Sequence, residues 1–506
     1  MMNLRLAKIL PVFVVTYLLA GCGPDISGGS GKDADAGRAD FSIFVAVGDS
    51  LTAGYGDGAL YRSIQQSSLA QILAQQFALA GGGEFDQPLM PEGATGSLNF
   101  GGTDLGRIDR VVLKATGDPD RPVSPQTITP VQSTDIQVRV AGAGNFNNMG
   151  IPGMKSFHML VPGYGELSPA AFLGGTSNPY FARFASSDVT AVISDAANLV
   201  PSFFTYWVGN NDIMLYALDG GAPNNAVPPY GVGTTDITDP AVFAVSYNAA
   251  LAVLKTPTNM GLLINIPGPA SVPYFTTVPY NAIPLTQAQA DDANLGFAAY
   301  NLIVQTRVGL APGGATCGID QAEADRRLIS FVAGQNAVVI LDESLTDLTP
   351  CLGPTVVNMR QATAEDYVIL PTSSKLGVDA GGGALWGISA PLLDADVLTK
   401  FEFDQVETAR AAYNATIKAA ADADPNLLFF DAAAKLVELD ETGILYGSGG
   451  VSSTFVQGGA FSLDGFHPTP RGNAVIANEI FKVINAGFDA FIPPVDPSNY
   501  ITVTYQ

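Results

Sequence analysis

Short apolar segments that end at a glycine, a proline or an aspartate recur along this chain and alternate with longer segments of helical spacing. The apolar segments are residues 41–47, 203–208, 262–266, 338–341 and 427–430. Runs of this length between turn residues are typical of strands that are buried on both faces of a parallel sheet. The predicted helices are 60–79, 286–305, 403–422 and 471–487. This alternation predicts an α/β fold with a doubly wound parallel sheet, which binds ligands beyond the carboxyl ends of its strands.

The composition allows a large core and restricts the classes of function. Of the 506 residues, 47% are hydrophobic and only 14% are charged, which excludes wholesale disorder. The formal charge is 24 − 47 = −23, which argues against nucleic-acid binding, because that affinity comes mainly from Lys and Arg that neutralise phosphates. His158 and His467 are the two histidines of the chain, too few for a His-rich zinc site, and we expect neither a metal nor a cofactor.

Segments rich in glycine, proline and polar residues interrupt the alternation of strands and helices. We therefore expect one α/β domain at residues 41–490, followed by a C-terminal tail at 491–506. Its insertions are predicted at about 85–145, 213–258 and 306–402. The first of these carries strand-like stretches among its turns, whereas the other two are rich in loops.

The N-terminus has the composition of a targeting signal rather than of folded structure. Arg5 and Lys8 give a basic start, and residues 9–20 are a largely apolar run that is too short to span a bilayer. The run closes with Leu-Ala-Gly before Cys22. This arrangement resembles the signal of bacterial lipoproteins, in which the peptide is cut before the cysteine and the cysteine is lipidated. An ordinary signal peptide with a chance cysteine is the alternative.

The resemblance implies a signal peptide at residues 1–21, a lipid at Cys22 and a place in the bacterial cell envelope, anchored to the outer membrane. Residues 22–40 are rich in Gly, Ser and Asp and are predicted to be a flexible tether. No later segment has about eighteen uninterrupted apolar residues, so the acyl chains would provide the anchor. Cys317 and Cys351 then remain, either as a disulfide in an oxidising compartment or as two buried free thiols.

A serine directly follows the first predicted strand, in the tetrapeptide Gly48-Asp49-Ser50-Leu51. A serine on a tight turn at the end of a strand is exposed above the sheet, with the N-terminus of the next helix behind it. Backbone N–H groups at the turn and the helix dipole both favour negative charge nearby, which suits a nucleophile. Alternatively, Ser50 is only a helix cap.

An aspartate and a histidine stand three residues apart near the C-terminus, in Asp464-Gly465-Phe466-His467. This offset on one loop lets the carboxylate hold the imidazole in the tautomer that accepts a proton from a serine. A structural role in the loop is the alternative for His467. The other histidine, His158, lies among apolar residues and is expected to be structural.

Two further turns offer hydrogen-bond donors. Asn211 follows a predicted strand, and its side chain can donate an N–H to a developing oxyanion. Gly153 ends a glycine-bearing turn at 148–153 that can expose a backbone N–H, and Gly150 in the same turn competes with it. The alternatives are an asparagine that caps a helix and a glycine that accommodates a positive φ.

Together, these four blocks resemble those of the GDSL family of SGNH hydrolases, a superfamily of esterases and lipases, and they stand in that family's order. The first block reads GDSLTAGYG. The resemblance implies a flavodoxin-like three-layer α/β/α sandwich with a parallel central sheet. It also implies that Ser50 is the nucleophile, that His467 is the general base and then the acid, and that Asp464 orients His467. The oxyanion hole would comprise the backbone N–H groups of Ser50 and Gly153 and the side chain of Asn211.

The resemblance implies a serine esterase that hydrolyses lipid or short-chain acyl esters through an acyl-enzyme and needs no cofactor. Two alternatives remain: a carbohydrate acetylesterase of the same fold, and a surface lipoprotein that keeps the fold for binding without catalysis. The blocks are far apart, with 103 residues from Ser50 to Gly153 and 253 from Asn211 to Asp464. The insertions therefore leave the acyl pocket, the substrate and the oligomeric state open.

Overall fold

The computed structural model describes residues 33–118, 121–222, 230–231, 233–311, 317–353, 357–447 and 449–506. The expected signal peptide, Cys22 and most of the expected tether therefore lie outside the described residues. Residues Ala34–Gln506 form one compact unit. Within the part of the chain that is described, no helix combines the length and the apolar character needed to cross a membrane.

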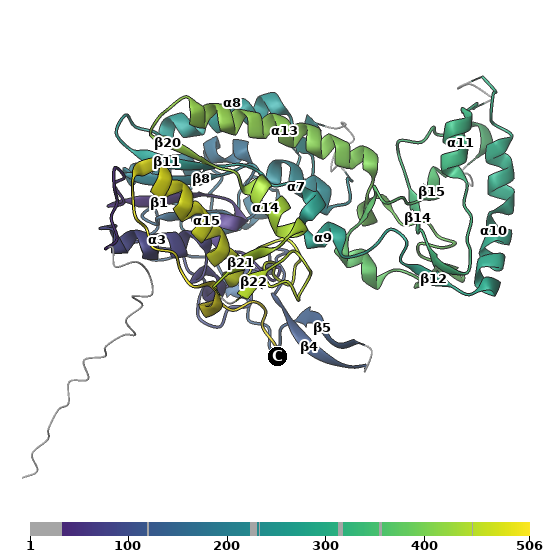
Figure 1. Ribbon diagram of the computed structural model, residues 1–506, viewed down its shortest axis with the longest axis horizontal. Coiled ribbons are helices and arrows are strands. Elements are labelled where there is room, and N and C mark those ends of the chain that lie inside the picture. The colour runs from purple at the N-terminus through teal and green to yellow at the C-terminus, as the bar shows by residue number, and fades with distance from the viewer. Residues whose placement is uncertain are drawn as a thin grey trace, which may run out of the picture. The chain divides into compact units, whose positions relative to one another are not determined.

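Parallel strands form the central sheet of the described chain (Figure 1). They are β1 (Phe44–Gly48), β7 (Asn148–Gly150), β8 (Phe203–Trp207), β11 (Met260–Ile264) and β20 (Leu427–Phe430). Their order is β20-β11-β8-β1-β7, which is 2-1-3-4-5 when the strands are counted along the chain and read from β7. In this doubly wound order the switch point lies between β1 and β8, where ligands bind beyond the carboxyl ends. Gly48 on β1 is level with Gly150 on β7 and with Trp207 on β8.

Helices bury both faces of the sheet. Phe44 and Ala46 of β1 pack into one apolar core, and Val45 and Val47, which point the other way, pack into a second core. The helices α3 (Leu69–Leu79) and α15 (Pro470–Phe488) pack into the first core. Those that pack into the second include α6 (Val192–Asn198), α8 (Pro240–Leu254) and α13 (Lys400–Asp422). A strand covered on both faces has no solvent side, which explains the continuous apolar runs in the sequence.

The structure corrects two predictions about strands and helices. Residues 338–341 do form a strand, β14 (Val339–Leu341), but it pairs antiparallel with β15 (Met359–Gln361) outside the central sheet. The predicted helix at 60–79 is two helices, α2 (Arg62–Gln65) and α3, because the side chain of Ser68 accepts a hydrogen bond from a backbone N–H of α3 and starts a new helix.

Part of the segment 213–258 belongs to the α/β body, although we expected an insertion rich in loops. α7 (Asn211–Leu218) follows β8 directly, and α8 covers the sheet. Phe243 and Tyr247 of α8 are fully buried in the second core. The apolar side chains of α8 are spread widely around the helix, so its sequence lacks the spacing by which an amphipathic helix is predicted.

The residues between β11 and α13 contain a lobe with an apolar core of its own, set apart from the sheet in Figure 1. The elements of this stretch are α9 (Pro273–Thr276), β12 (Ile283–Leu285), α10 (Gln287–Gln305), α11 (Gln321–Arg327), β13 (Gly334–Asn336), β14, α12 (Thr349–Leu352), β15, β16 (Tyr367–Val368), β17 (Asp379–Gly381), β18 (Ala384–Leu385) and β19 (Val397–Leu398). Cys317 and Cys351 form a disulfide within the lobe. Its core begins at Val278, so the predicted helix at 286–305, which is α10, belongs to the lobe and not to a layer on the sheet.

The remaining elements are short. They are α1 (Ser50–Ala53), α4 (Pro169–Leu173), α5 (Pro179–Ala182), α14 (Ala432–Glu441), β2 (Leu98–Phe100), β3 (Thr103–Asp104), β4 (Val111–Asp118), β5 (Arg121–Thr127), β6 (Thr134–Asp135), β9 (Tyr230–Gly231), β10 (Ile237–Thr238), β21 (Ile444–Tyr446), β22 (Gly449–Val451) and the 3₁₀ helices Ser156–Leu160, Pro269–Ser271, Leu370–Ser374, Asp394–Asp396 and Pro497–Asn499. The expected tail at 491–506 lies partly against β4, because Leu113 exchanges backbone hydrogen bonds with Thr504 and Gln506.

Candidate active site

Ser50 is the first residue of α1 and stands directly beyond the carboxyl end of β1. Asp49 caps α1, because its side chain accepts a hydrogen bond from the N–H of Leu51 at 3.0 Å. Only a glycine fits at position 48, since a Cβ there would overlap the side chain of Thr52 and lie 2.8 Å from the carbonyl oxygen of Trp207. The sharp turn from strand to helix therefore holds Ser50 at the sheet edge, with 7% of its surface exposed.

The structure brings Ser50, His467 and Asp464 together in one line of contacts. The Oγ of Ser50 lies 2.9 Å from Nε2 of His467, and Nδ1 of His467 lies 2.9 Å from Oδ2 of Asp464. Since a carboxylate can only accept, Nδ1 carries a proton and Nε2 is free to accept the proton of the Ser50 hydroxyl. This is the arrangement of a nucleophile, a general base and an orienting carboxylate.

Asp464 is held ionised by its surroundings. Burial alone would raise the pKa of its carboxyl, but the charge of His467 and the hydrogen bonds from His467 and from the backbone N–H of Phe466 outweigh burial and lower the pKa to about 2. Gly58 adds a backbone N–H at 2.9 Å and Ser462 a hydroxyl at 2.9 Å. A charged carboxylate with this many donors is a fixed partner for the imidazole.

Two residues that the sequence analysis did not select fix the loop that carries Asp464 and His467. The carboxylate of Asp57 accepts from the backbone N–H of Leu463 at 2.9 Å and from the hydroxyl of Tyr61 at 2.6 Å. Ser462 accepts from the backbone N–H of Asp57 and donates to Asp464. The Asp57 turn thus ties the two ends of the chain together, more than 400 residues apart, and a single sequence carries no signal for such a contact.

Three parallel strand ends bring the expected oxyanion donors to the same edge as Ser50. Gly153 stands just beyond β7, and Asn211 stands just beyond β8. The side-chain amide of Asn211 donates to the carbonyl oxygen of Met154 at 3.0 Å, which holds it against the Gly153 turn. None of the hydrogen bonds described for the chain uses the backbone N–H of Ser50 or of Gly153, so both can bind an anionic oxygen.

Gly150, which competes with Gly153 in the sequence, is already engaged. Its backbone N–H donates to Oδ1 of Asn148 at 2.9 Å. Gly153 has φ of +79° and lies at an open position, where a Cβ would meet nothing within 4 Å. The geometry therefore favours Gly153 as the donor.

A buried pair, Asp49 and Asn210, connects β1 to the loop after β8 beneath the Ser50 turn. The amide of Asn210 donates to Oδ2 of Asp49 at 2.8 Å. Burial raises the pKa of Asp49 to about 6, against the opposing effect of the hydrogen bonds from Asn210 and Leu51. Asn210 stands beside Asn211 in the same motif, and only the structure shows that the amide of Asn210 supports the Ser50 turn.

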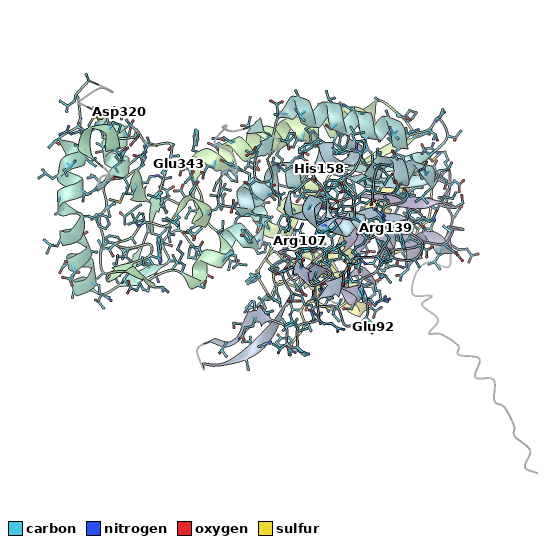
Figure 2. All side chains as sticks on the ribbon, turned by 180° about the vertical axis from the view of Figure 1, so that it is seen from behind. Glu92, Arg107, Arg139, His158, Asp320 and Glu343 are labelled. Atoms are coloured by element: carbon cyan, nitrogen blue, oxygen red, sulfur yellow. A yellow bond between two sulfur atoms is a disulfide. The ribbon has the colours of Figure 1, made fainter. Side chains whose placement is uncertain are left out.

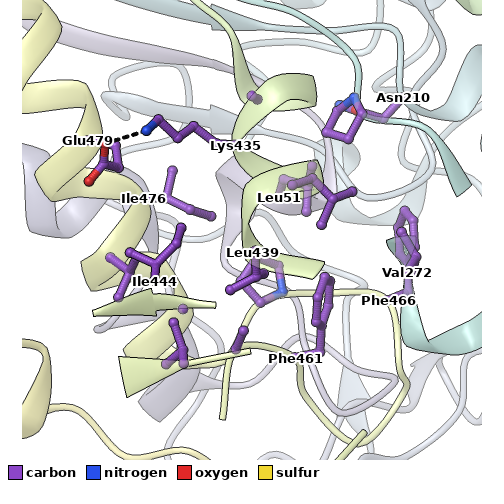
Figure 3. A pocket seen from close by; sticks show the side chains of 18 of the residues that line it. Leu51, Asn210, Val272, Lys435, Leu439, Ile444, Phe461, Phe466, Ile476 and Glu479 are labelled. Atoms are coloured by element: carbon purple, nitrogen blue, oxygen red, sulfur yellow. Dashed lines mark ion pairs between the residues drawn. The ribbon is translucent and has the colours of Figure 1, made fainter. Parts of the chain in front are cut away.

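An apolar pocket borders the site (Figure 3). Leu51 and Asn210 contribute to its wall next to Ser50, and Phe466 and Pro468 contribute on either side of His467. Almost all of its other lining side chains are aliphatic or aromatic, as in pockets that bind small apolar ligands. The sequence did not predict this pocket, since its lining residues come from many separate segments.

The remaining histidine, His158, has contacts of its own and takes no part in the line of Ser50, His467 and Asp464. Nδ1 of His158 accepts the backbone N–H of Lys155 at 3.1 Å, and its ring stacks on Tyr164 at 4.5 Å between centroids. Burial, together with the nearby charge of Lys155, lowers the pKa of His158 to about 4, so the ring is neutral. Figure 2 labels His158 within the body of the molecule and Glu343 near the lobe.

Three acidic side chains gather where the lobe meets the body. Glu343, Asp394 and Glu402 each place one oxygen within 4.8 Å of the other two. Burial, followed by the charges of the neighbouring acids, raises the pKa of Asp394 and of Glu402 above the ordinary carboxyl range. Acidic side chains often gather without a cation, and no second feature of this cluster points to one, so we assign no metal to it.

Comparisons of the chain with protein-family models, with curated proteins and with solved structures returned no match. The function of the site is therefore inferred from its geometry and from the motifs that form it.

Proposed function

We propose that the chain is a serine esterase of the GDSL type within the SGNH hydrolases, with their flavodoxin-like three-layer fold, and that it hydrolyses carboxylic esters. The single observation that carries the proposal is the pair of 2.9 Å contacts that join Ser50 to His467 and His467 to Asp464. The strand order, which puts the serine beside the switch point of the sheet, supports the same conclusion.

In the first half of the reaction, the Oγ of Ser50 attacks the ester carbonyl while its proton moves to Nε2 of His467. The C–O bond to the alcohol then breaks, and the alcohol leaves with that proton, so an acyl group remains on Ser50. In the second half, His467 takes a proton from water, and the hydroxide attacks the acyl carbon. The bond from this carbon to Oγ of Ser50 then breaks, the acid leaves, and His467 returns the proton to Oγ. Asp464 stays ionised and stabilises the imidazolium in both halves.

Negative charge develops on the carbonyl oxygen in both halves. The backbone N–H groups of Ser50 and Gly153 and the side-chain amide of Asn211 are the donors that we assign to it. One such donor is typically worth about 2.7–4 kcal/mol of transition-state stabilisation. Asn211 donates one of its two amide hydrogens to the carbonyl oxygen of Met154, so the other hydrogen is free to bind the oxyanion.

Replacement of the nucleophile tests the proposal. We expect Ser50→Ala to abolish the hydrolysis of p-nitrophenyl butyrate and the labelling by a fluorophosphonate probe, because no other group replaces the Ser50 oxygen. Both are measured on purified protein whose fold is checked by circular dichroism. Ser63→Ala, an exposed serine on α2, is the matched control and should keep full activity. Turnover in Ser50→Ala at the wild-type rate would refute the assignment, and a folded wild-type protein without labelling would favour the binding lipoprotein.

We also propose that the protein is exported and held at the bacterial outer membrane by a lipid at Cys22. The basic start, the short apolar run and the small residues before Cys22 support this proposal. Radiolabelled palmitate should be incorporated into the wild-type protein and not into Cys22→Ala. Equal incorporation in both would show that Cys22 is not the site of attachment.

A further inference from the structure

The apolar pocket beside Ser50 runs along one face of α15 (Figure 3). Gly472, Val475, Ile476 and Glu479 line it, and their spacing places them on one side of the helix. From Gly472 to Glu479 the helix rises by about 10 Å, at about 1.5 Å for each residue. An extended hydrocarbon chain of about eight carbon atoms has this length.

The two ends of the pocket differ in chemistry. The Gly472 end lies against Pro468, the neighbour of His467, since a Cβ on Gly472 would lie 3.2 Å from Cβ of Pro468. At the other end, Nζ of Lys435 on α14 lies 3.0 Å from Oε2 of Glu479. Figure 3 shows this ion pair across the pocket from Asn210. A hydrocarbon chain cannot replace the hydrogen bonds of an ion pair, so the apolar path ends there.

The β21–β22 hairpin covers the pocket at the same end. Ile444 on β21 lines the pocket and lies on the side of Glu479 in Figure 3. The next residue, Leu445, points the other way and is 86% exposed. Neighbouring residues of one strand thus provide a position that faces the pocket and one that does not.

We propose that this pocket holds the acyl chain of the ester and that the Lys435–Glu479 ion pair limits its length, so that the substrates are esters of medium-chain acids of about eight to twelve carbons, of which about eight lie along α15. This assignment rests on the proposed esterase function and adds the acyl specificity to it. With the carbonyl carbon at Ser50, the chain passes Leu51 and lies along α15. The ion pair and Ile444 are then determinants of specificity and take no part in the chemistry.

The test is the rate profile over p-nitrophenyl esters with two to sixteen acyl carbons, for the wild type, Ile444→Trp and Leu445→Trp. We expect kcat/KM of the wild type to peak between the octanoyl and the dodecanoyl ester. Ile444→Trp fills the end of the pocket and should lower kcat/KM for the ester that the wild type prefers by at least tenfold more than it lowers kcat/KM for the acetyl ester. Leu445→Trp adds the same side chain outside the pocket and should keep the wild-type profile.

A second variant tests the ion pair in the opposite direction. Lys435→Leu together with Glu479→Leu extends the apolar surface, and Lys482, the other partner of Glu479, is 71% exposed and stays solvated. We expect the optimum of this double variant to move to acyl chains longer than the wild-type optimum. An optimum that stays at the wild-type length would show that the ion pair does not limit the chain.

Failure of this inference is distinct from failure of the proposed function. If hydrolysis depends on Ser50 but the wild type prefers acetyl esters, or if folded Ile444→Trp keeps the wild-type profile, the acyl assignment is overturned and the esterase remains. If hydrolysis persists in Ser50→Ala, the proposed function itself fails.

Discussion

At the scale of single residues, the two oxygens of Asp464 have different partners. Oδ1 accepts from the hydroxyl of Ser462 and from the backbone N–H groups of Phe466 and His467. Oδ2 accepts from the backbone N–H of Gly58 and faces Nδ1 of His467. Because the pKa of this carboxyl is about 2, it is ionised at any pH at which an esterase would be assayed. It therefore fixes the proton on Nδ1 and leaves Nε2 as a base.

This division of partners predicts the outcome of Asp464→Asn. The three donors to Oδ1 keep the amide oxygen at that position, so the amide nitrogen faces Nδ1 of His467. An amide nitrogen only donates, so Nδ1 must give up its proton to Nε2, which then cannot accept the proton of Ser50. We expect kcat to fall by about 10³–10⁴-fold, as loss of the correct tautomer does in serine hydrolases, with little change in KM.

Steady-state kinetics on a p-nitrophenyl ester measure this loss. Asp489→Asn, the same substitution at an exposed carboxylate, should leave kcat unchanged. If Asp464→Asn lowered kcat by less than tenfold, Asp464 would not orient the base.

At the scale of elements, the close packing of β7 against α1 sets the place of the nucleophile. A Cβ on Gly150 would overlap the backbone of Ala53 and lie 2.6 Å from the carbonyl carbon of Thr52. No rotamer change relieves a clash with backbone, so Gly150→Ala must move β7 or α1. We expect a loss of about 1–3 kcal/mol of unfolding free energy and a fall in activity, because Ser50 begins α1.

Gly296→Ala is the matched control, because Gly296 lies in α10 and a Cβ there would meet nothing within 4 Å. It should stabilise the protein by up to about 1 kcal/mol through helix propensity. Urea unfolding followed by circular dichroism compares the two variants. Equal stability of Gly150→Ala and the wild type would show that β7 and α1 are not packed this closely.

The elements that the sequence predicted are those with strong local patterns. Four strands of the central sheet are continuous apolar runs because helices cover both of their faces. β7 has only three residues and begins with Asn148, so its sequence is typical of a turn. The apolar run that forms β14 predicts a strand, but the sequence does not indicate which sheet this strand joins. The motifs at Ser50 and His467 could also be predicted from the sequence, because each is formed by a few consecutive residues.

The parts of the site that depend on distant contacts were not predictable. Ser462 and Asp57 meet across 405 residues, and Asn210 reaches Asp49 across 161. Neither contact leaves a periodicity or a spacing in the sequence. The apolar pocket is of the same kind, because it forms only where α14, α15, the sheet edge and the β21–β22 hairpin meet.

At the scale of the whole molecule, three acids lie where the lobe meets the body, and one of them, Glu402, is buried. Glu402 lies in the first turn of α13 and is 4% exposed. Asp394 lies in the chain leading to α13, and Gly221, just beyond the end of α7, packs against the carboxyl of Glu402. One oxygen of Glu402 accepts from the backbone N–H and the hydroxyl of Thr399. The hydrogen-bond donors to the Glu402 carboxyl therefore come from Thr399, the cap of its own helix. The acids beside it disfavour the ionised form of Glu402.

The consequence is a stability that falls as the pH rises. Burial, with the charges of Asp394 and Glu343, raises the pKa of Glu402 in the folded protein above its ordinary value of 4.5. A raised folded-state pKa means that the stabilisation is complete below pH 4.5 and is lost as the pH rises through the raised value.

Glu402→Gln keeps an oxygen for Thr399 and carries no charge, so its melting temperature should fall less than that of the wild type between pH 5 and pH 9. Thermal unfolding at a series of pH values measures the difference, and Glu84→Gln, at an exposed position, should follow the wild type. If Glu402→Gln had the same slope as the wild type, Glu402 would not be a protonated group at this junction. A steeper slope would also contradict the argument, because it would mean that the charged form stabilises the fold.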